Sequence, residues 1–193
     1  MILRFFALTL FVFVAGLSQA QVRVENASFE GEAQDATTPV RWHECSDETT
    51  PDILPGFWGV TTEAADGETF MGLITRDIGS WEAVGQRLPE PLVKDMCYEF
   101  SVELAHSPTY AGYNLPVKLL IWGSRTRCDR KQLLGEVPYV DHPDWKKYKF
   151  EFTADKDFPY IIIEAGYIDG LTFPYKGNIL IDNCSAFQLC KRA

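Results

Sequence analysis

The chain has 193 residues, of which 18 are lysine or arginine and 27 are aspartate or glutamate, so its formal net charge is −9. A chain of this length suits one domain with a substantial hydrophobic core. The negative charge argues against nucleic acid and anionic membranes as partners, because both repel an acidic protein.

Residues 1–20, MILRFFALTLFVFVAGLSQA, have the pattern of a secretory signal peptide. A positive residue precedes an apolar run from Phe5 to about Leu17, and small residues precede the expected cleavage after Ala20. The run is shorter than the roughly 20 residues of a membrane-spanning helix. We therefore expect a soluble mature domain, residues 21–193, with no membrane span, that is secreted, periplasmic or on the cell surface.

Apolar and polar residues alternate with a period of two along much of the mature sequence. In YKFEFTA, for example, Tyr148, Phe150 and Phe152 alternate with polar residues. Such alternation places one face of a strand on a core and the other outward. Further segments expected to form strands are CYEFSVELA, VKLLIWG, FPYIIIEAGY and NILIDNCSAF. Turn signals separate these segments and helical periodicity is nearly absent, which predicts a single all-β domain, an antiparallel β-sandwich.

Five segments, in chain order, resemble jelly-roll carbohydrate-binding modules of the galactose-binding-domain-like group (CenC-like). They are NASFEG after the leader, ADGETFMGL, VGQRLPEPLVKDMCYEFSVELA, WKKYKFEFTA and ILIDNCSAF. The resemblance covers almost the whole mature chain and is more specific for the fold than for any ligand. It implies a jelly roll in which the first strand, around Phe29, and the last, around Ile181, are hydrogen-bonded neighbours.

Many members of this group hold a structural calcium ion where these two strands meet. The family's glutamate falls on Glu30 and its aspartate on Asp182, and Asp66 in an Asp-Gly turn is a further candidate ligand. Calcium prefers several oxygen ligands, which carboxylates and strand-edge carbonyls supply. The alternative is that these acids end strands or cap turns and bind no metal.

The mature chain has five cysteines, an odd number that leaves at least one thiol without an intramolecular partner. The resemblance implies that Cys97 pairs with Cys190, because the strands that carry them run antiparallel side by side in the family. Cys45 and Cys128 then remain for each other. Cys184 falls on an apolar position of the family and is expected to stay reduced as a small hydrophobic residue.

Aromatic residues outside the expected core are candidates for sugar binding, because their faces stack on the apolar side of a pyranose. We predict that Trp58, Tyr110 and Tyr113 line one groove with Trp122 or Trp42. Trp122 is expected to point away from the core. For Trp42 and Trp58 the alternative is packing against the end of the sandwich.

Arginines are candidates to clamp hydroxyl or carboxylate groups of a ligand. These candidates are Arg76, Arg125 and Arg127, although solvated arginines are the commoner case.

The sequence contains no Gly-x-Ser-x-Gly, His-x-His or His-Glu-x-x-His motif, and its three histidines are far apart. We therefore predict an exported, non-catalytic carbohydrate-binding module. The competing interpretation is a structural or adhesion module of a cell-surface assembly that binds protein, and a glycan-active hydrolase comes third. A groove with two or more exposed aromatic residues favours sugar, and a broad apolar patch favours protein.

Overall fold

The computed structural model describes residues 21–46 and 48–191, so the predicted signal peptide lies outside the described residues. Twelve strands and no helix form within the described ranges. No helix there could therefore cross a membrane.

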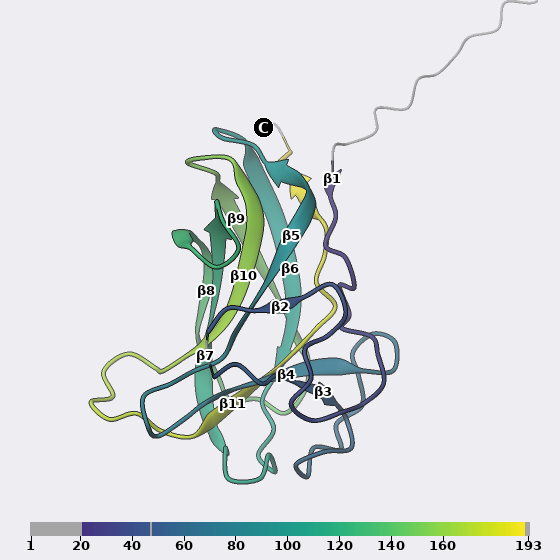
Figure 1. The fold of residues 1–193 in the computed structure, drawn as a ribbon, viewed down its shortest axis with the longest axis vertical. Helices are drawn as coiled ribbons and strands as arrows, with labels where there is room; N and C mark the ends of the chain where they lie inside the picture. Colours follow the sequence, from purple (N-terminus) through teal and green to yellow (C-terminus); the bar gives the residue numbers. More distant parts are fainter. Residues whose placement is uncertain (1–20, 47, 192–193) are drawn as a thin grey trace, which may run out of the picture.

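The strands form two layers, which confirms the predicted antiparallel β-sandwich (Figure 1). Sheet A has the order β3 (Asp52–Leu54), β4 (Phe70–Thr75), β11 (Gly177–Asp182), β6 (Cys97–Ala105) and β9 (Lys146–Thr153). Two short strands, β12 (Phe187–Leu189) and β1 (Gln21–Val22), extend it beside the first part of β6. Sheet B has the order β2 (His43–Glu44), β5 (Ala83–Leu92), β10 (Phe158–Gly166), β7 (Leu115–Ser124) and β8 (Arg130–Val140).

Period-two alternation fills the space between the sheets. Along β7, Val117, Leu119 and Ile121 are buried in the main core, while the residues between them are partly exposed. Ile161 and Ile163 of β10 join the same core. Alternation in the sequence thus predicts correctly which face of these strands packs inward.

The first and last described segments lie side by side, as the resemblance implies, but not through the predicted strands. Gln21 is paired with Gln188 in the β1–β12 ladder. Further along, the amide of Cys184 donates to the carbonyl of Ala27 at 2.9 Å.

The prediction of a strand around Phe29 next to Ile181 is wrong. Phe29 lies in a turn with a φ of 53°, and its amide donates to the carbonyl of Asn26 at 3.2 Å. The Asn26 side chain closes the turn by accepting a hydrogen bond from the Glu30 amide at 2.8 Å. Ile181 is instead paired with Met71 and Leu104.

Both predicted disulfides are present. Cys97 and Cys190 are joined with a Cα–Cα distance of 5.4 Å, and Cys45 and Cys128 with a distance of 5.2 Å. Cys184 is a buried free thiol that packs in the main core. The first bridge fastens the last strand to the start of β6, and the second fastens the β7–β8 loop to the end of β2.

Replacing Cys97 and Cys190 together by serine is expected to lower the free energy of unfolding by about 2–4 kcal/mol, because the bridge restricts the unfolded chain. Urea unfolding under oxidising conditions measures this, with Cys184→Ala as the matched control. The control is expected to retain both bridges in non-reducing peptide mapping. In peptide mapping of the wild type, a bridge that contains Cys184 would contradict the assignment.

Candidate functional site

Three of the predicted ligand-binding aromatics gather at one end of the sandwich. The carbonyl of Trp58 accepts a hydrogen bond from the amide of Ala111 at 2.8 Å, next to Tyr110. The Tyr110 and Tyr113 rings meet edge to face with centroids 6.3 Å apart. Trp58 is 47% exposed, and Tyr113 is half-buried beneath the Lys176 ammonium group.

Tyr110 and Trp42 do not offer their faces to a ligand, which corrects the predicted groove. Tyr110 is 1% exposed, and its hydroxyl donates to the buried carboxylate of Asp52. Trp42 is 7% exposed, packs on Phe29 with ring centroids 5.1 Å apart and donates from Nε1 to the Asn26 carbonyl. Both are core residues, because large rings at the ends of a sandwich cover apolar surface that would otherwise meet water.

Trp122 faces outward from sheet B, as predicted. It lies on the opposite side of β7 from Ile121 and packs against Ile162 and the Cys45–Cys128 bridge. Ile162 is its direct neighbour on β10. Trp122 is therefore remote from the Trp58 end, and the five predicted aromatics do not share one groove.

The outer face of sheet B carries further aromatic groups beside Trp122. Tyr160 and Ile162 alternate outward along β10, and the His43 ring meets the Tyr160 ring edge to face at 6.2 Å. The His43 Nε2 atom lies 2.9 Å from the carbonyl oxygen of Arg127, in the β7–β8 loop. Burial lowers the pKa of His43, so its imidazole is neutral at pH 7.

A buried ion pair continues this face. Glu164, two residues beyond Ile162 on β10, is 5% exposed and pairs with the Arg130 guanidinium. Burial raises the pKa of Glu164, and the charge of Arg130 and a hydrogen bond from Trp81 oppose that rise. Trp81 is 37% exposed and stands edge-on to Tyr167 at 6.2 Å. We call Trp81, Trp122, Tyr160, His43, Arg130 and Glu164 the sheet-B face.

The indole N–H of Trp122 is buried and has no acceptor among the described residues. Trp42 and Trp145 donate to the carbonyls of Asn26 and Glu63, and Trp58 and Trp81 lie near the carboxylates of Asp52 and Glu164. Buried donors in native proteins normally have a partner. An acceptor oxygen from a bound molecule would satisfy the Trp122 donor.

Sequence reasoning identified Trp122 but not Tyr160 or the Arg130–Glu164 pair. Tyr160 and Glu164 are marked by the alternation of FPYIIIEAGY, in which they share a face with Ile162. No sequence pattern indicates that Arg130 reaches Glu164, because the two residues are 34 positions apart.

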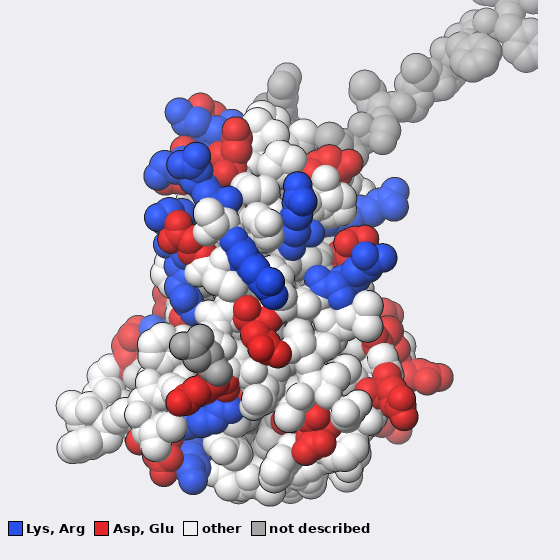
Figure 2. Space-filling view, in the orientation of Figure 1, with Lys and Arg blue, Asp and Glu red and all other residues white. Residues whose placement is uncertain are grey.

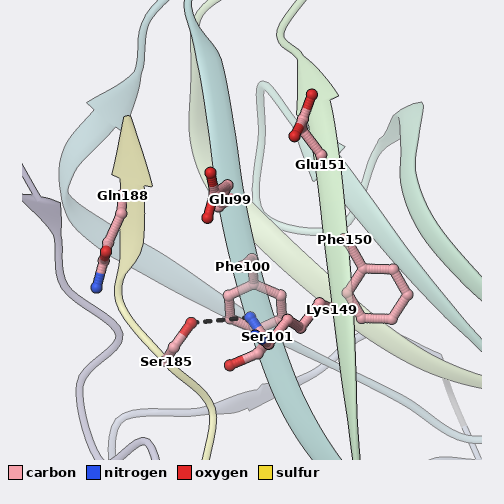
Figure 3. Close-up of a pocket in the computed structure, with 8 residues that line it drawn as sticks. All are labelled: Glu99, Phe100, Ser101, Lys149, Phe150, Glu151, Ser185 and Gln188. Carbon is pink, nitrogen blue, oxygen red and sulfur yellow. Dashed lines mark hydrogen bonds between the residues drawn. The ribbon is translucent and has the colours of Figure 1, made fainter. Parts of the chain in front are cut away.

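A hollow lies on the outer face of the other sheet, sheet A (Figure 3). It has a volume of about 430 Å³ and lies over β6, β9 and β12. Glu99 faces Glu151 across the β6–β9 pair, and Gln188 faces Glu99 from β12. The Ser185 hydroxyl accepts a hydrogen bond from the Ser101 amide at 2.8 Å. We call this hollow the sheet-A groove. Its polar groups are open to a ligand, but of its two aromatic residues Phe100 belongs to the core and Phe150 packs against the core.

The three predicted calcium ligands gather around one turn, residues 65–69. Asp182 is fully buried and accepts hydrogen bonds from the amides of Ala65 and Asp66 at 2.8 and 3.0 Å. Glu30 accepts hydrogen bonds from the amides at positions 68 and 69, and Asp66 accepts one from Ser28.

This arrangement does not fit a calcium ion, because the oxygens of Glu30 and Asp182 face amide hydrogens instead of a shared cavity. Across the described residues, the only groups of three possible metal ligands include the cysteines of a disulfide: His43 with Cys45 and Cys128, and Glu151 with Cys97 and Cys190. Sulfur in a disulfide is not a thiolate ligand. Calcium remains a prediction of the resemblance.

No family model matches the sequence, and no curated protein matches it. Solved structures share the fold. A cyclase from Fischerella sp. TAU superposes with a TM-score of 0.57 and 13% identity over 88% of this chain and 97% of that chain. The CBM22-1 xylan-binding domain from Paenibacillus barcinonensis Xyn10C gives a TM-score of 0.50 and 17% identity over 86% of this chain and 94% of that chain.

The K1 cleaved adhesin domain of Lys-gingipain from Porphyromonas gingivalis W83 gives a TM-score of 0.55 and 10% identity over 85% of this chain and 96% of that chain. At such low identity, these similarities establish the jelly-roll β-sandwich fold. The fold is shared by proteins described as a cyclase, a xylan-binding domain and an adhesin domain, so it does not select among functions.

Asp182 is expected to make stability depend on pH. Burial raises its pKa from 3.8 to about 6. Because the folded-state pKa lies above the unfolded value, the stabilisation is present at low pH and is lost as pH rises through 6. The free energy of unfolding of the wild type, relative to Asp182→Asn, should therefore fall by up to about 3 kcal/mol between pH 4 and pH 7. Urea titrations in EDTA measure this difference, and a pH-independent difference would contradict it.

Calcium is expected to change the melting temperature by less than about 2 °C, because the amides of the 65–69 turn already satisfy Glu30 and Asp182. Thermal melts in millimolar calcium chloride and in EDTA test this, with Glu30→Gln as a comparison. If calcium raises the melting temperature by more than this, and Glu30→Gln abolishes the rise, the predicted site would be established. The 65–69 turn would then have to rearrange to bind the ion.

Proposed function

We propose that this protein is an exported carbohydrate-binding module that holds a glycan against the sheet-B face without cleaving it. The observation that carries the proposal is Trp122, whose partly exposed ring lies on this face and whose indole N–H has no acceptor in the described part of the chain. Carbohydrate sites combine aromatic faces with a few polar groups. Trp81, Trp122 and Tyr160 supply the rings, and Arg130 and Glu164 supply the polar groups.

Export is supported by the leader-like residues 1–20 and by the two disulfides, which persist mainly in oxidising compartments. The xylan-binding domain from Paenibacillus barcinonensis supports the carbohydrate interpretation to the extent that it shares the fold. Binding without cleavage is supported by Glu164, the buried carboxylate of the face, which the Arg130 ion pair and the Trp81 hydrogen bond already engage.

Protein binding is the second candidate, and a specific observation favours it. Loops 76–80 and 167–176 carry Ile78, Leu171 and Phe173, which are 73%, 57% and 81% exposed. The loops contact each other, because Lys176 pairs with Asp77 at 3.6 Å. Exposed apolar groups of this kind are typical of an interaction surface.

Replacing Trp122 or Tyr160 by alanine is expected to weaken glycan binding by about 1–3 kcal/mol, as for a well-placed aromatic anchor. Trp122→Phe keeps a ring but removes the N–H, so it should recover part of the loss. A glycan array on residues 21–193, followed by calorimetry on the glycans that bind, measures these effects. Incubation with those glycans should release no reducing ends.

Two matched controls locate the site. Trp58→Ala removes an exposed tryptophan at the end of the sandwich where Tyr110 and Tyr113 lie, and Glu99→Gln alters the sheet-A groove. Both are expected to bind like the wild type. Loss of binding in either control, with Trp122→Ala unaffected, would place the glycan elsewhere. If no glycan binds and a protein partner is found whose binding Phe173→Ala abolishes, the second candidate replaces the first.

A further inference from the structure

Most arginines of the described chain have no partner. Arg76 pairs with Glu82 and Arg130 with Glu164. The other five described arginines are exposed and form no ion pair or side-chain hydrogen bond with a described residue; they are Arg23, Arg41, Arg87, Arg125 and Arg127. The lysines differ, since six of the nine form ion pairs: Lys94, Lys118, Lys131, Lys147, Lys156 and Lys176.

Three of the free arginines surround the Tyr160 end of the sheet-B face. Arg87 is on β5, directly opposite Tyr160 of β10. Arg127 lies over Gly85, where an added Cβ would come within 3.2 Å of the Arg127 carbonyl oxygen, and its charge contributes to the lowered pKa of His43. Arg125 lies two residues earlier in the same loop.

The other two free arginines extend this group along β5. Arg23 and Arg41 line one hollow together with the exposed Glu90 and with Pro89, the next outward position of β5 after Arg87. Successive outward positions on a strand are about 6.6 Å apart, so the group spans on the order of 13 Å from Gly85 to Pro89. Figure 2 shows this face of the molecule, on which basic side chains cross the middle over β5 and β10.

Acidic groups do not neutralise the centre of this group. Glu25, Glu30 and Glu90 line the same hollow as Arg23 and Arg41, so that end is mixed in charge. Glu44 of β2 lies nearer the centre, and its carboxylate accepts a hydrogen bond from Thr38. We define the arginine cluster as Arg87, Arg125 and Arg127, where positive charge is uncompensated by ion pairs.

We propose that the arginine cluster selects an anionic polysaccharide, one that bears carboxylate or sulfate groups, over a neutral one. This inference rests on the proposed function, because it names the class of glycan that the sheet-B face binds. Guanidinium groups form two parallel hydrogen bonds to a carboxylate or sulfate, which an ammonium group does not. Uncompensated arginines in a chain of net charge −9 concentrate attraction for anions on one face.

The position of the cluster favours a polysaccharide over other polyanions. Tyr160 lies next to Arg87, so a pyranose stacked on its ring would present its acidic substituents to the guanidinium groups. The net negative charge of the whole chain disfavours duplex nucleic acid more than such a polysaccharide, because the duplex carries about one negative charge per 1.7 Å and the polysaccharide only one per sugar.

The test compares binding to polygalacturonate, which carries one carboxylate per sugar, with binding to neutral dextran and xylan at low salt. The wild type is expected to prefer polygalacturonate, and 0.5 M sodium chloride should remove most of that preference by screening. Arg87→Ala and the double variant Arg125→Ala/Arg127→Ala are each expected to weaken polygalacturonate binding about tenfold.

Lys149→Ala is the matched control, because it removes one exposed positive charge from the other sheet. It is expected to bind polygalacturonate like the wild type. Equal weakening by Lys149→Ala, or tighter binding of dextran or xylan than of polygalacturonate, would overturn the inference while leaving carbohydrate binding intact. Binding to none of the probes or array glycans would instead contradict the proposed function.

Discussion

The burial of β11 on both of its faces is the constraint on which the rest of the structure depends. All six of its residues are buried. Ile179 and Ile181 point into the main core between the sheets, and Leu180 points into a second apolar cluster with Phe70 and Tyr110. β11 pairs antiparallel with β4 and β6, and its first residues also pair with the start of β7. One strand thereby contacts both layers and the second apolar cluster.

Polar groups on β11 are buried only because each has partners. The Asn178 amide donates to the carbonyls of Ser107 and Tyr113 at 2.8 and 2.6 Å and accepts from the Ser107 amide. At the other end of the strand, Asp182 accepts from the turn that begins at Ala65. These bonds fix the two loops that flank β11, since a buried polar group without a partner is costly. The acids that resemble calcium ligands therefore act here as acceptors for backbone amides.

The sheet-B face depends on a different constraint, the Cys45–Cys128 bridge. It holds the β7–β8 loop over β5, so that Arg127 meets His43 and covers Gly85. A Cβ at position 85 would approach the His43 Nε2 atom to 2.7 Å and the Cys45 Sγ atom to 2.8 Å, so a side chain at this position would displace the ring or the bridge. The same loop supplies Arg125 and Arg127 to the arginine cluster and precedes Arg130, which reaches Glu164. One disulfide therefore organises both the polar groups and the free positive charge of the face.

Alternation along the chain by itself determined that the fold is a sandwich of strands and that Trp122 points away from the core, because a period of two fixes the face of each residue within its strand. The resemblance of ordered segments added the Cys97–Cys190 pair, and Cys45–Cys128 followed from it by elimination. Only the tertiary structure decided that Phe29 lies in a turn, since Asn26 closes that turn through a side-chain bond that no periodicity reports. It also decided that Trp42 and Tyr110 are buried and that Tyr160, His43 and Arg87 meet on one face. Loop residues have no alternation to read, and neighbours across a sheet come from distant parts of the chain, so their proximity follows from strand order and not from local sequence.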